Sequence, residues 1–147
     1  MSIIKHDFEK MNITKIKQSK NNKKLTVITA YDALFSNLFS KSADMILVGD
    51  SLNMSFMGKS DTLSATLDQM IYHASSVIRG IYRALVVVDL PFGSYQGNSK
   101  EALQSAIRIM KESGAHAIKL EGGEEVVESI KRIVSAGIPV MGHLGLT

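Results

Sequence analysis

The sequence contains no cysteine and no tryptophan, and only two of its 147 residues are proline. Without cysteine the chain can form neither disulfides nor thiolate metal sites, which is compatible with a reducing compartment. No apolar run approaches the ~20 residues of a membrane-spanning helix, and the lysine-rich start lacks the apolar stretch of a secretory signal. We therefore expect a soluble cytoplasmic protein with no membrane partner.

Excess positive charge is confined to the start of the chain. The formal net charge is +3, but residues 1–24 alone carry seven lysines against two acids, so the remaining 123 residues are net negative by two. A nucleic-acid-binding surface on the main domain has no electrostatic support in this distribution. We predict a basic N-terminal arm or helix over 1–24, followed by one domain over 25–147.

The hydrophobic residues of this domain alternate between short runs and longer segments of helical period. Five runs are continuous, rich in valine or isoleucine, and too short for helices, as is typical of parallel strands buried on both faces. They are LTVITA (25–30), MILVG (45–49), ALVVVD (84–89), HAIKL (116–120) and IPVMG (138–142).

Four helices are predicted between these strands, each with recognisable end signals. The signals are Asp32 as an N-cap, Thr66 with Gln69 as a capping box, Ser99 and Gly114 around the third helix, and Glu124 and Gly137 around the fourth. Strand and helix alternating without a break predicts right-handed βαβ units and an α/β fold. Two architectures remain open at this point: an open doubly wound sheet, which the length favours, or part of an eight-stranded barrel of ~250 residues.

Polar side chains gather where the predicted strands end. Asp50 and Ser51 follow the second strand, Asp89 ends the third, Lys119 and Glu121 end the fourth, and His143 ends the fifth. The carboxyl ends of parallel strands are where ligands bind in α/β folds, which favours the barrel and predicts a site at this rim.

The three acids of this rim require a counter-charge. If Asp50, Asp89 and Glu121 converge to ~5 Å, each pair repels by about 3 kcal/mol at an effective dielectric constant of about 20. Lys119 lies two residues before Glu121 and so shares its face of the strand, but it supplies only one positive charge. A hard divalent cation held by carboxylate oxygens, with Mg²⁺ the usual candidate, would balance the site.

Such a site suits a substrate with adjacent carboxylate and keto oxygens. A bound cation would act as a Lewis acid on an enolate next to the ketone, and Lys119 would pair with the negative charge. The rim offers no obvious general base: His143 is available by position, whereas His73 and His116 are expected to be structural.

Six segments closely resemble the ketopantoate hydroxymethyltransferase family, in the order and spacing of that family. They are ITAYD (28–32), VGDSLNM (48–54), TLDQMIYH (66–73), VVVDLPFGSYQ (86–96), AIKLEGG (117–123) and GIPVMGHLGLT (137–147).

The resemblance implies a parallel (β/α)₈ TIM barrel of the phosphoenolpyruvate/pyruvate type, of which this chain would hold about the first five strands. By this resemblance Asp50, Asp89 and Glu121 match the Mg²⁺ site, and Ser51, Asp89 and Lys119 match residues that hold the α-keto acid. Lys119 and His143 match residues of the catalytic pocket. Family members form ketopantoate from α-ketoisovalerate (3-methyl-2-oxobutanoate) with 5,10-methylenetetrahydrofolate as cosubstrate, and they assemble as decamers.

The sequence departs from the family pattern at two points. Asn53 stands where we expect glycine, and asparagine would tolerate a left-handed backbone there. The family sequence continues through three more strands, and its general-base glutamate lies in that part. We therefore expect the 147 residues to belong to a longer gene product and to be inactive alone, with an exposed edge at the fifth strand.

Two other kinds of protein fit parts of the pattern. One is another Mg²⁺-dependent enzyme, similar to isocitrate lyase or phosphonomutase, which would share the metal site but not the PFGSYQ and GHLGLT segments. The other is an open-sheet regulatory α/β module such as a phospho-receiver domain, or an inactive interaction fragment.

Overall fold

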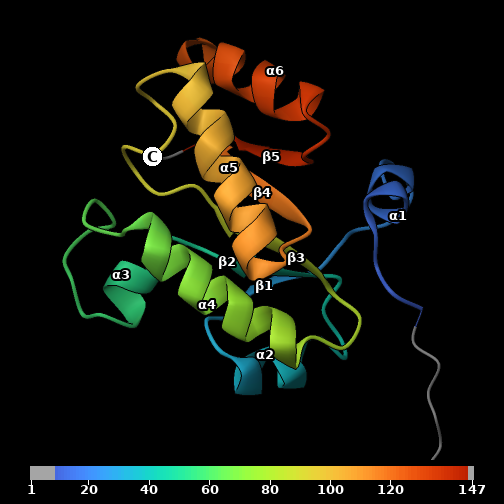
Figure 1. Cartoon of the computed structure of the whole chain (residues 1–147). Coiled ribbons are helices and arrows are strands. Elements are labelled where there is room, and N and C mark those ends of the chain that lie inside the picture. The colour runs from blue at the N-terminus through green and yellow to red at the C-terminus, as the bar shows by residue number, and fades with distance from the viewer. Residues whose placement is uncertain (1–8, 146–147) are drawn as a thin grey trace, which may run out of the picture.

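The computed structural model describes residues 9–145, so the first eight residues of the predicted arm and the last two of GHLGLT lie outside it. Its five strands form one parallel sheet in which the spatial order follows the chain order (Figure 1). The strands are β1 (Val27–Thr29), β2 (Met45–Val48), β3 (Leu85–Asp89), β4 (Ala117–Glu121) and β5 (Val140–His143). A doubly wound sheet reverses its strand order at a switch point, whereas a barrel wall does not. The order therefore confirms the barrel and contradicts the open-sheet regulatory module.

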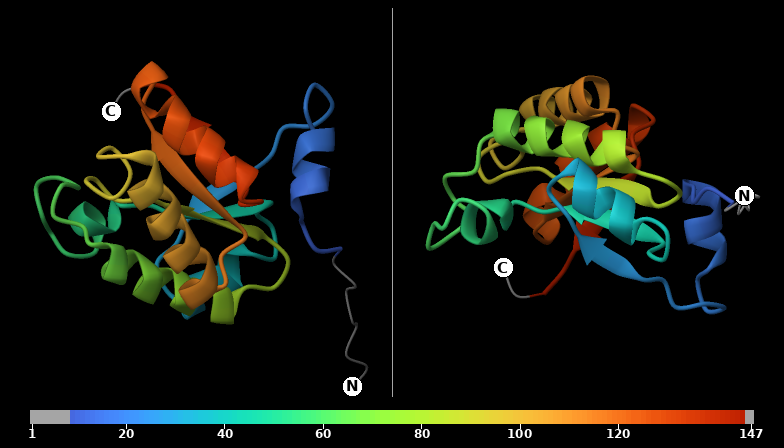
Figure 2. Two further views of the ribbon diagram at one scale, coloured as in Figure 1. Left: turned by 45° about the horizontal axis from the view of Figure 1, so that its top comes forward. Right: turned by 90° about the horizontal axis from the view of Figure 1, so that it is seen from below.

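Most of the helices cover one face of the sheet, which corresponds to the outer face of a barrel wall. The elements are α1 (Ile13–Gln18), α2 (Ala33–Phe39), α3 (Leu52–Ser55), α4 (Leu67–Gly80), α5 (Ser99–Ser113), a 3₁₀ turn η1 (Glu124–Val126) and α6 (Val127–Ser135). Helices α2, α4, α5 and α6 pack in this succession along the outer face, whereas α1 stands apart from them (Figures 1 and 2). No helix within residues 9–145 is long and apolar enough to cross a membrane.

The predicted end signals form the expected contacts. Asp32 accepts a hydrogen bond from the Phe35 backbone at 2.9 Å, and Thr66 forms a complete capping box with Gln69. Gly114 ends α5 in the left-handed conformation, with φ 78°. The fourth predicted helix differs at its start, because its first turn is the 3₁₀ turn η1.

The two faces of the sheet form two separate cores. Residues such as Ile46, Val88 and Ile118 point outward and pack against the helices in the main core. The alternate residues, among them Met45 and Leu85, point inward, where α1 covers part of them. The N-terminal helix thus lies over the inner face of the wall, near the amino ends of the strands.

The prediction that every strand is buried on both faces is wrong for β1. Val27 is 49% exposed and Ile28 37%, and β5 is only half-buried, whereas all five residues of β3 are buried. The cause is position, because β1 and β5 are the two end strands of the sheet.

Helix α2 packs through small residues and Phe39, and its other large apolar side chains are exposed. Leu34 is 75% exposed, whereas Ser36 is buried and donates a hydrogen bond from Oγ to the Val77 carbonyl at 2.8 Å. A Cβ atom added to Gly80 would lie 2.1 Å from the carbonyl oxygen of Ala33. Glycine at this point is therefore what lets α2 and α4 approach each other.

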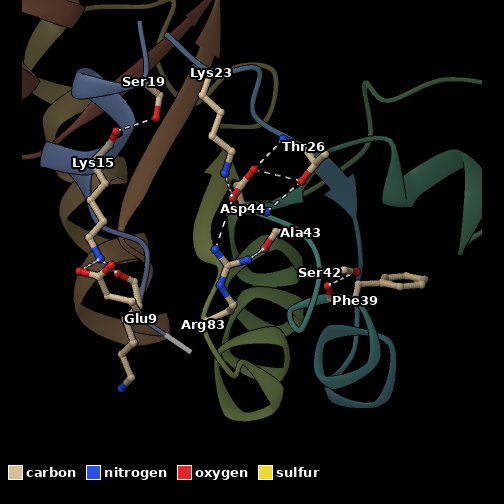
Figure 3. Close-up of polar contacts among 11 residues, drawn as sticks. Glu9, Lys15, Ser19, Lys23, Thr26, Phe39, Ser42, Ala43, Asp44 and Arg83 are labelled. Atoms are coloured by element: carbon tan, nitrogen blue, oxygen red, sulfur yellow. Dashed lines mark hydrogen bonds and ion pairs between the residues drawn. The ribbon is translucent and has the colours of Figure 1, made fainter. Parts of the chain in front are cut away.

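A buried carboxylate at the amino end of β2 joins the N-terminal segment to the sheet (Figure 3). Asp44 accepts hydrogen bonds from the Thr26 backbone at 3.0 Å and the Thr26 hydroxyl at 3.2 Å, and it faces Lys23 and Arg83. Burial acts to raise the pKa of Asp44, but the Thr26 backbone bond and the Lys23 charge outweigh it, so the net direction is downward. Asp44 is therefore a stabilising anion in the folded state.

Candidate active site

Four of the six predicted rim residues line one cavity, and Ser51 and His143 lie outside its lining. Asp50, Asp89, Lys119 and Glu121 all line a cavity of about 370 Å³ at the carboxyl ends of the strands. A larger cavity of about 510 Å³ lies beneath α1, but its lining is apolar apart from Lys17 among the described residues. The rim cavity, which holds the charged side chains, is therefore the candidate active site.

Lys119 lies at the centre of the rim cluster. Its Nζ atom is 2.9 Å from Oδ1 of Asp89 and 3.2 Å from Oε1 of Glu121. The register explains the arrangement: Asp89 pairs with Lys119 across β3 and β4, and Glu121 follows two residues later on the same face. The ends of β3 and β4 thus place the Lys119 ammonium between two carboxylates.

His143 joins the cluster through Glu121. Its Nδ1 atom lies 2.7 Å from Oε1 of Glu121, and the two residues are register partners across β4 and β5. Burial acts to raise the pKa of Glu121, but its contacts with Lys119 and His143 outweigh it and lower the pKa overall. Glu121 is accordingly the one rim acid whose surroundings favour its charged form, whereas those of Asp50 and Asp89 favour protonation.

Asp50 approaches the cluster from the end of β2. Its backbone N–H donates to Oδ2 of Asp89 at 3.3 Å, and its carboxylate interacts with the side chain of Thr62. Burial, and then repulsion from Glu121, raise the pKa of Asp50 above its ordinary value. The Asp50 carboxylate therefore carries a charge that its surroundings only partly balance.

Burial sets the direction of the pKa shift at Asp89, whereas the neighbouring charges set the direction of the pKa shift at Lys119. Burial raises the pKa of Asp89 despite the adjacent ammonium. Burial acts to lower the pKa of Lys119, but Asp89 and Glu121 reverse that and the net shift is upward. Both partners of the ion pair thus shift toward protonation, because Asp89 is deeply buried and also faces Asp50.

A divalent cation fits the chemistry of this donor set, although not as a finished three-carboxylate site. Three carboxylates face one ammonium, and the pKa values of Asp50 and Asp89 are raised by burial first and by the neighbouring carboxylates second. Within the described residues, however, no three Asp, Glu or His side chains are grouped as a metal site. Among the described residues the ammonium of Lys119 pairs with Asp89 and Glu121 but not with Asp50, so a cation would be held at Asp50, with Asp89 beside it.

Ser51 belongs to a hydroxyl chain beside Asp89. Its Oγ atom lies 2.9 Å from the Tyr31 hydroxyl, to which Ser55 donates a hydrogen bond at 3.2 Å. A Cβ atom added to Gly49 would fall 2.8 Å from Ser51 Oγ and 3.5 Å from Asp89 Oδ2, which shows how closely this turn approaches both. The predicted substrate-binding serine is therefore at the rim, next to the cavity.

The segment after Ser51 is helical. Residues Leu52–Ser55 form the short helix α3, and Asn53 lies inside it. Asn53 does not adopt the left-handed backbone that asparagine would tolerate, because Asn21 is the one non-glycine residue with positive φ in residues 9–145.

The other two histidines of the domain have structural contacts, as predicted. Nδ1 of His73 lies 2.8 Å from the Tyr31 carbonyl, and Nδ1 of His116 accepts a hydrogen bond from the Val86 backbone at 2.9 Å. Neither lines the rim cavity.

Comparison with known proteins decides the family. The profile of ketopantoate hydroxymethyltransferase matches residues 10–147. The chain belongs to the ketopantoate hydroxymethyltransferase family. A 3-methyl-2-oxobutanoate hydroxymethyltransferase from Aliarcobacter butzleri is 62% identical over 146 residues, covering 99% of this chain and 54% of that protein. One from Christiangramia forsetii is 58% identical over 149 residues, covering 100% and 55%. The chain thus spans about half the length of these ketopantoate hydroxymethyltransferases.

Solved structures support the barrel fold for this family member. Phosphoenolpyruvate phosphomutase from Streptomyces platensis subsp. rosaceus matches with a TM-score of 0.69 at 16% identity, over 89% of this chain and 53% of that one. A phosphonopyruvate hydrolase in complex with oxalate and Mg²⁺ matches with a TM-score of 0.69 at 12% identity, over 90% and 52%. A 2,3-dimethylmalate lyase of the PEP mutase/isocitrate lyase superfamily matches with a TM-score of 0.62 at 17% identity, over 88% and 52%. At such low identity these likenesses show the fold alone.

Sequence reasoning missed two residues of the candidate site. The Tyr95 hydroxyl accepts a hydrogen bond from the Glu121 backbone at 3.3 Å, and Thr62 lines the cavity beside Asp50. Tyr95 lies in the recognised PFGSYQ segment, which could have signalled it. Thr62 lies eleven residues beyond Ser51 in an irregular segment, and nothing in the spacing points to it.

Proposed function

We propose that the complete protein is a cytoplasmic 3-methyl-2-oxobutanoate hydroxymethyltransferase. It joins the one-carbon unit of 5,10-methylenetetrahydrofolate and the hydroxyl of one water, as a hydroxymethyl group, to C3 of the keto acid, giving 2-dehydropantoate (ketopantoate) and tetrahydrofolate. Family membership at about 60% identity supports the reaction. The observation that carries the proposal is the Lys119 ammonium, held between Asp89 and Glu121 inside a cavity of about 370 Å³. A buried ammonium beside hydrogen-bonding groups is suited to a small α-keto acid.

The rim residues have different roles toward the substrate. Lys119 pairs with the substrate carboxylate and with the negative charge that grows on the keto oxygen when the proton at C3 leaves. Ser51 and Asp89 orient the α-keto acid from the neighbouring strand ends. His143 acts through Glu121, which together with the larger effect of Asp89 raises the pKa of Lys119.

The apolar part of the cavity fits the branched carbon of the keto acid. Five aliphatic and aromatic residues are among its lining: Leu63, Leu90, Phe92, Leu120 and Val126. A branched alkyl group placed there would be shielded from water, while its carboxylate reaches Lys119.

A Mg²⁺ ion would be held by Asp50 and Asp89, with Glu121 contributing to the charge balance through Lys119. When bound, the ion supplies Lewis-acid stabilisation of the enolate oxygen. We assign the proton acceptor at C3 to none of the described residues. The binding of folate and the homo-oligomeric, decameric assembly are carried over from the family as part of the proposal.

The test uses the complete translation product of the gene. It is incubated with 3-methyl-2-oxobutanoate, 5,10-methylenetetrahydrofolate and Mg²⁺, and ketopantoate is measured by mass spectrometry. We expect ketopantoate to form, and to fall to background in EDTA. Cleavage of 2,3-dimethylmalate or phosphonopyruvate without ketopantoate formation would overturn the proposal and favour another activity of the same fold.

A further inference from the structure

Asn53 is buried next to the candidate site and makes three hydrogen bonds to one segment of chain. It lies three residues after Asp50, and only 1% of its surface is exposed. Its side-chain amide donates to the Asp61 carbonyl at 2.8 Å and to Ser64 Oγ at 2.9 Å. The main-chain carbonyl of Asn53 accepts a hydrogen bond from the Lys59 backbone N–H at 2.9 Å. These bonds hold segment 59–64 at both of its ends.

Segment 59–64 forms one wall of the rim cavity. Thr62 and Leu63 line the cavity, and the Thr62 side chain interacts with the Asp50 carboxylate. Within the segment, Asp61 Oδ1 accepts from the Leu63 backbone at 3.0 Å, which fixes the shape of the turn. Most of the segment is exposed to solvent, so its own burial contributes little to its position.

We propose that Asn53 is a positioning residue: by fixing segment 59–64 it places Thr62 and Leu63 as a wall of the keto-acid cavity, without touching the substrate itself. The identity of the ligand rests on the proposed function. An asparagine suits the role because one buried planar amide supplies two N–H donors to two separate acceptors. Glycine or alanine supplies none, and aspartate would present oxygen to the Asp61 carbonyl.

The first test measures the wall directly and does not depend on the enzyme activity. Asn53→Ala, Ser64→Ala and the matched control Asn37→Ala are exposed to trypsin under native conditions, and cleavage after Lys59 is followed by mass spectrometry. Asn37 also donates from its amide to a backbone carbonyl, that of Gly80 at 3.3 Å, but it lies on α2, outside the lining of the cavity. We expect cleavage to accelerate about tenfold in Asn53→Ala, less in Ser64→Ala, and not in Asn37→Ala, because the exposed segment opens more often once the hydrogen bonds that hold it are lost.

The second test separates positioning from general destabilisation. In the complete translation product, Asn53→Ala should raise the KM for 3-methyl-2-oxobutanoate about tenfold while kcat changes far less, since a misplaced wall weakens binding. Unchanged cleavage and unchanged KM in Asn53→Ala would overturn the inference, and so would equal effects in Asn37→Ala. If Asn53→Ala does not fold, as judged by circular dichroism, the same criteria apply to Ser64→Ala. Faster cleavage with no ketopantoate formed even by the unsubstituted protein would instead reject the proposed function and leave the wall in place.

Discussion

Lys119 and Asp89 are direct register partners on adjacent strands, and their side chains meet at 2.9 Å between Nζ and Oδ1. The contact joins a buried cation to a buried anion at the carboxyl end of the sheet. Because the register fixes it, neither side chain needs a flexible loop to reach the other. The pair is therefore built into the barrel wall.

Lys119→Met should abolish turnover in the complete translation product. Loss of the ammonium removes the charge that meets the substrate carboxylate and the enolate, and we expect kcat/KM to fall by at least about a thousandfold. Lys119→Arg should recover only a small part of this, because the larger guanidinium fits poorly between Asp89 and Glu121. Lys100→Met, on the exposed start of α5, serves as the control and should leave kcat/KM unchanged.

Asp50→Asn should stabilise the protein at pH 7 in EDTA. The folded state raises the pKa of Asp50 above 3.8, so it binds the proton more tightly than the unfolded state. Stability is therefore lost as the pH rises from the unfolded pKa through the folded one, and asparagine removes this loss. We expect a rise in Tm of about 3 °C at pH 7 and a smaller one at pH 4, measured by calorimetry.

The same substitution tests the cation site. Mg²⁺ should raise the Tm of the unsubstituted protein, and this rise should disappear in Asp50→Asn. Asp68→Asn, an exposed acid paired with Arg108 on the outer helices, should keep the full Mg²⁺ effect. A Mg²⁺-dependent rise of equal size in Asp50→Asn would show that Asp50 does not hold the ion.

Asp44→Asn should destabilise the protein, in the opposite direction to Asp50→Asn. The pKa of Asp44 is lowered in the folded state, so its contribution is complete above the unfolded value of 3.8 and is lost as the pH falls through the folded pKa. Because charge-assisted hydrogen bonds from Thr26 are weakened, we expect a loss of about 2 kcal/mol in urea denaturation at pH 7. At pH below the folded pKa the two proteins should be equally stable, and a constant difference at all pH values would contradict this assignment.

Gly80→Ala should disrupt the contact between α2 and α4. The added Cβ atom would lie 2.1 Å from the Ala33 carbonyl oxygen, which is backbone and cannot move aside alone. We expect a loss of about 3 kcal/mol in the free energy of unfolding. Gly142→Ala, where no atom lies within 4 Å of the added Cβ, should change stability by less than about 0.5 kcal/mol.

The strands and the rim could be predicted from the sequence because both depend on local signals. Short apolar runs mark the strands, and the polar residue after each run marks the rim, so Asp50, Asp89 and Lys119 were placed correctly. The exposure of Val27 could not be predicted, because it depends on β1 being an end strand of the sheet.

The pairing within the rim was also beyond the sequence. The spacing places Lys119 near three acids, but only the register shows that Asp89 and Glu121 bind it and that Asp50 does not share those ion pairs. Asn53 was noted only as a departure from a family pattern, and its contacts with Asp61 and Ser64 depend on the path of the irregular segment that follows. Such contacts carry no periodic signal.

The most direct measurement of the central claim is hydrogen exchange at C3 of 3-methyl-2-oxobutanoate in D₂O without folate, which reports formation of the enolate at the rim. The complete translation product with Mg²⁺ should remove the C3 proton signal in NMR spectra far faster than buffer alone, and Lys119→Met should not. Exchange that proceeds equally fast in Lys119→Met, or ketopantoate formation without any exchange, would contradict the assignment of the Lys119, Asp89 and Asp50 cluster.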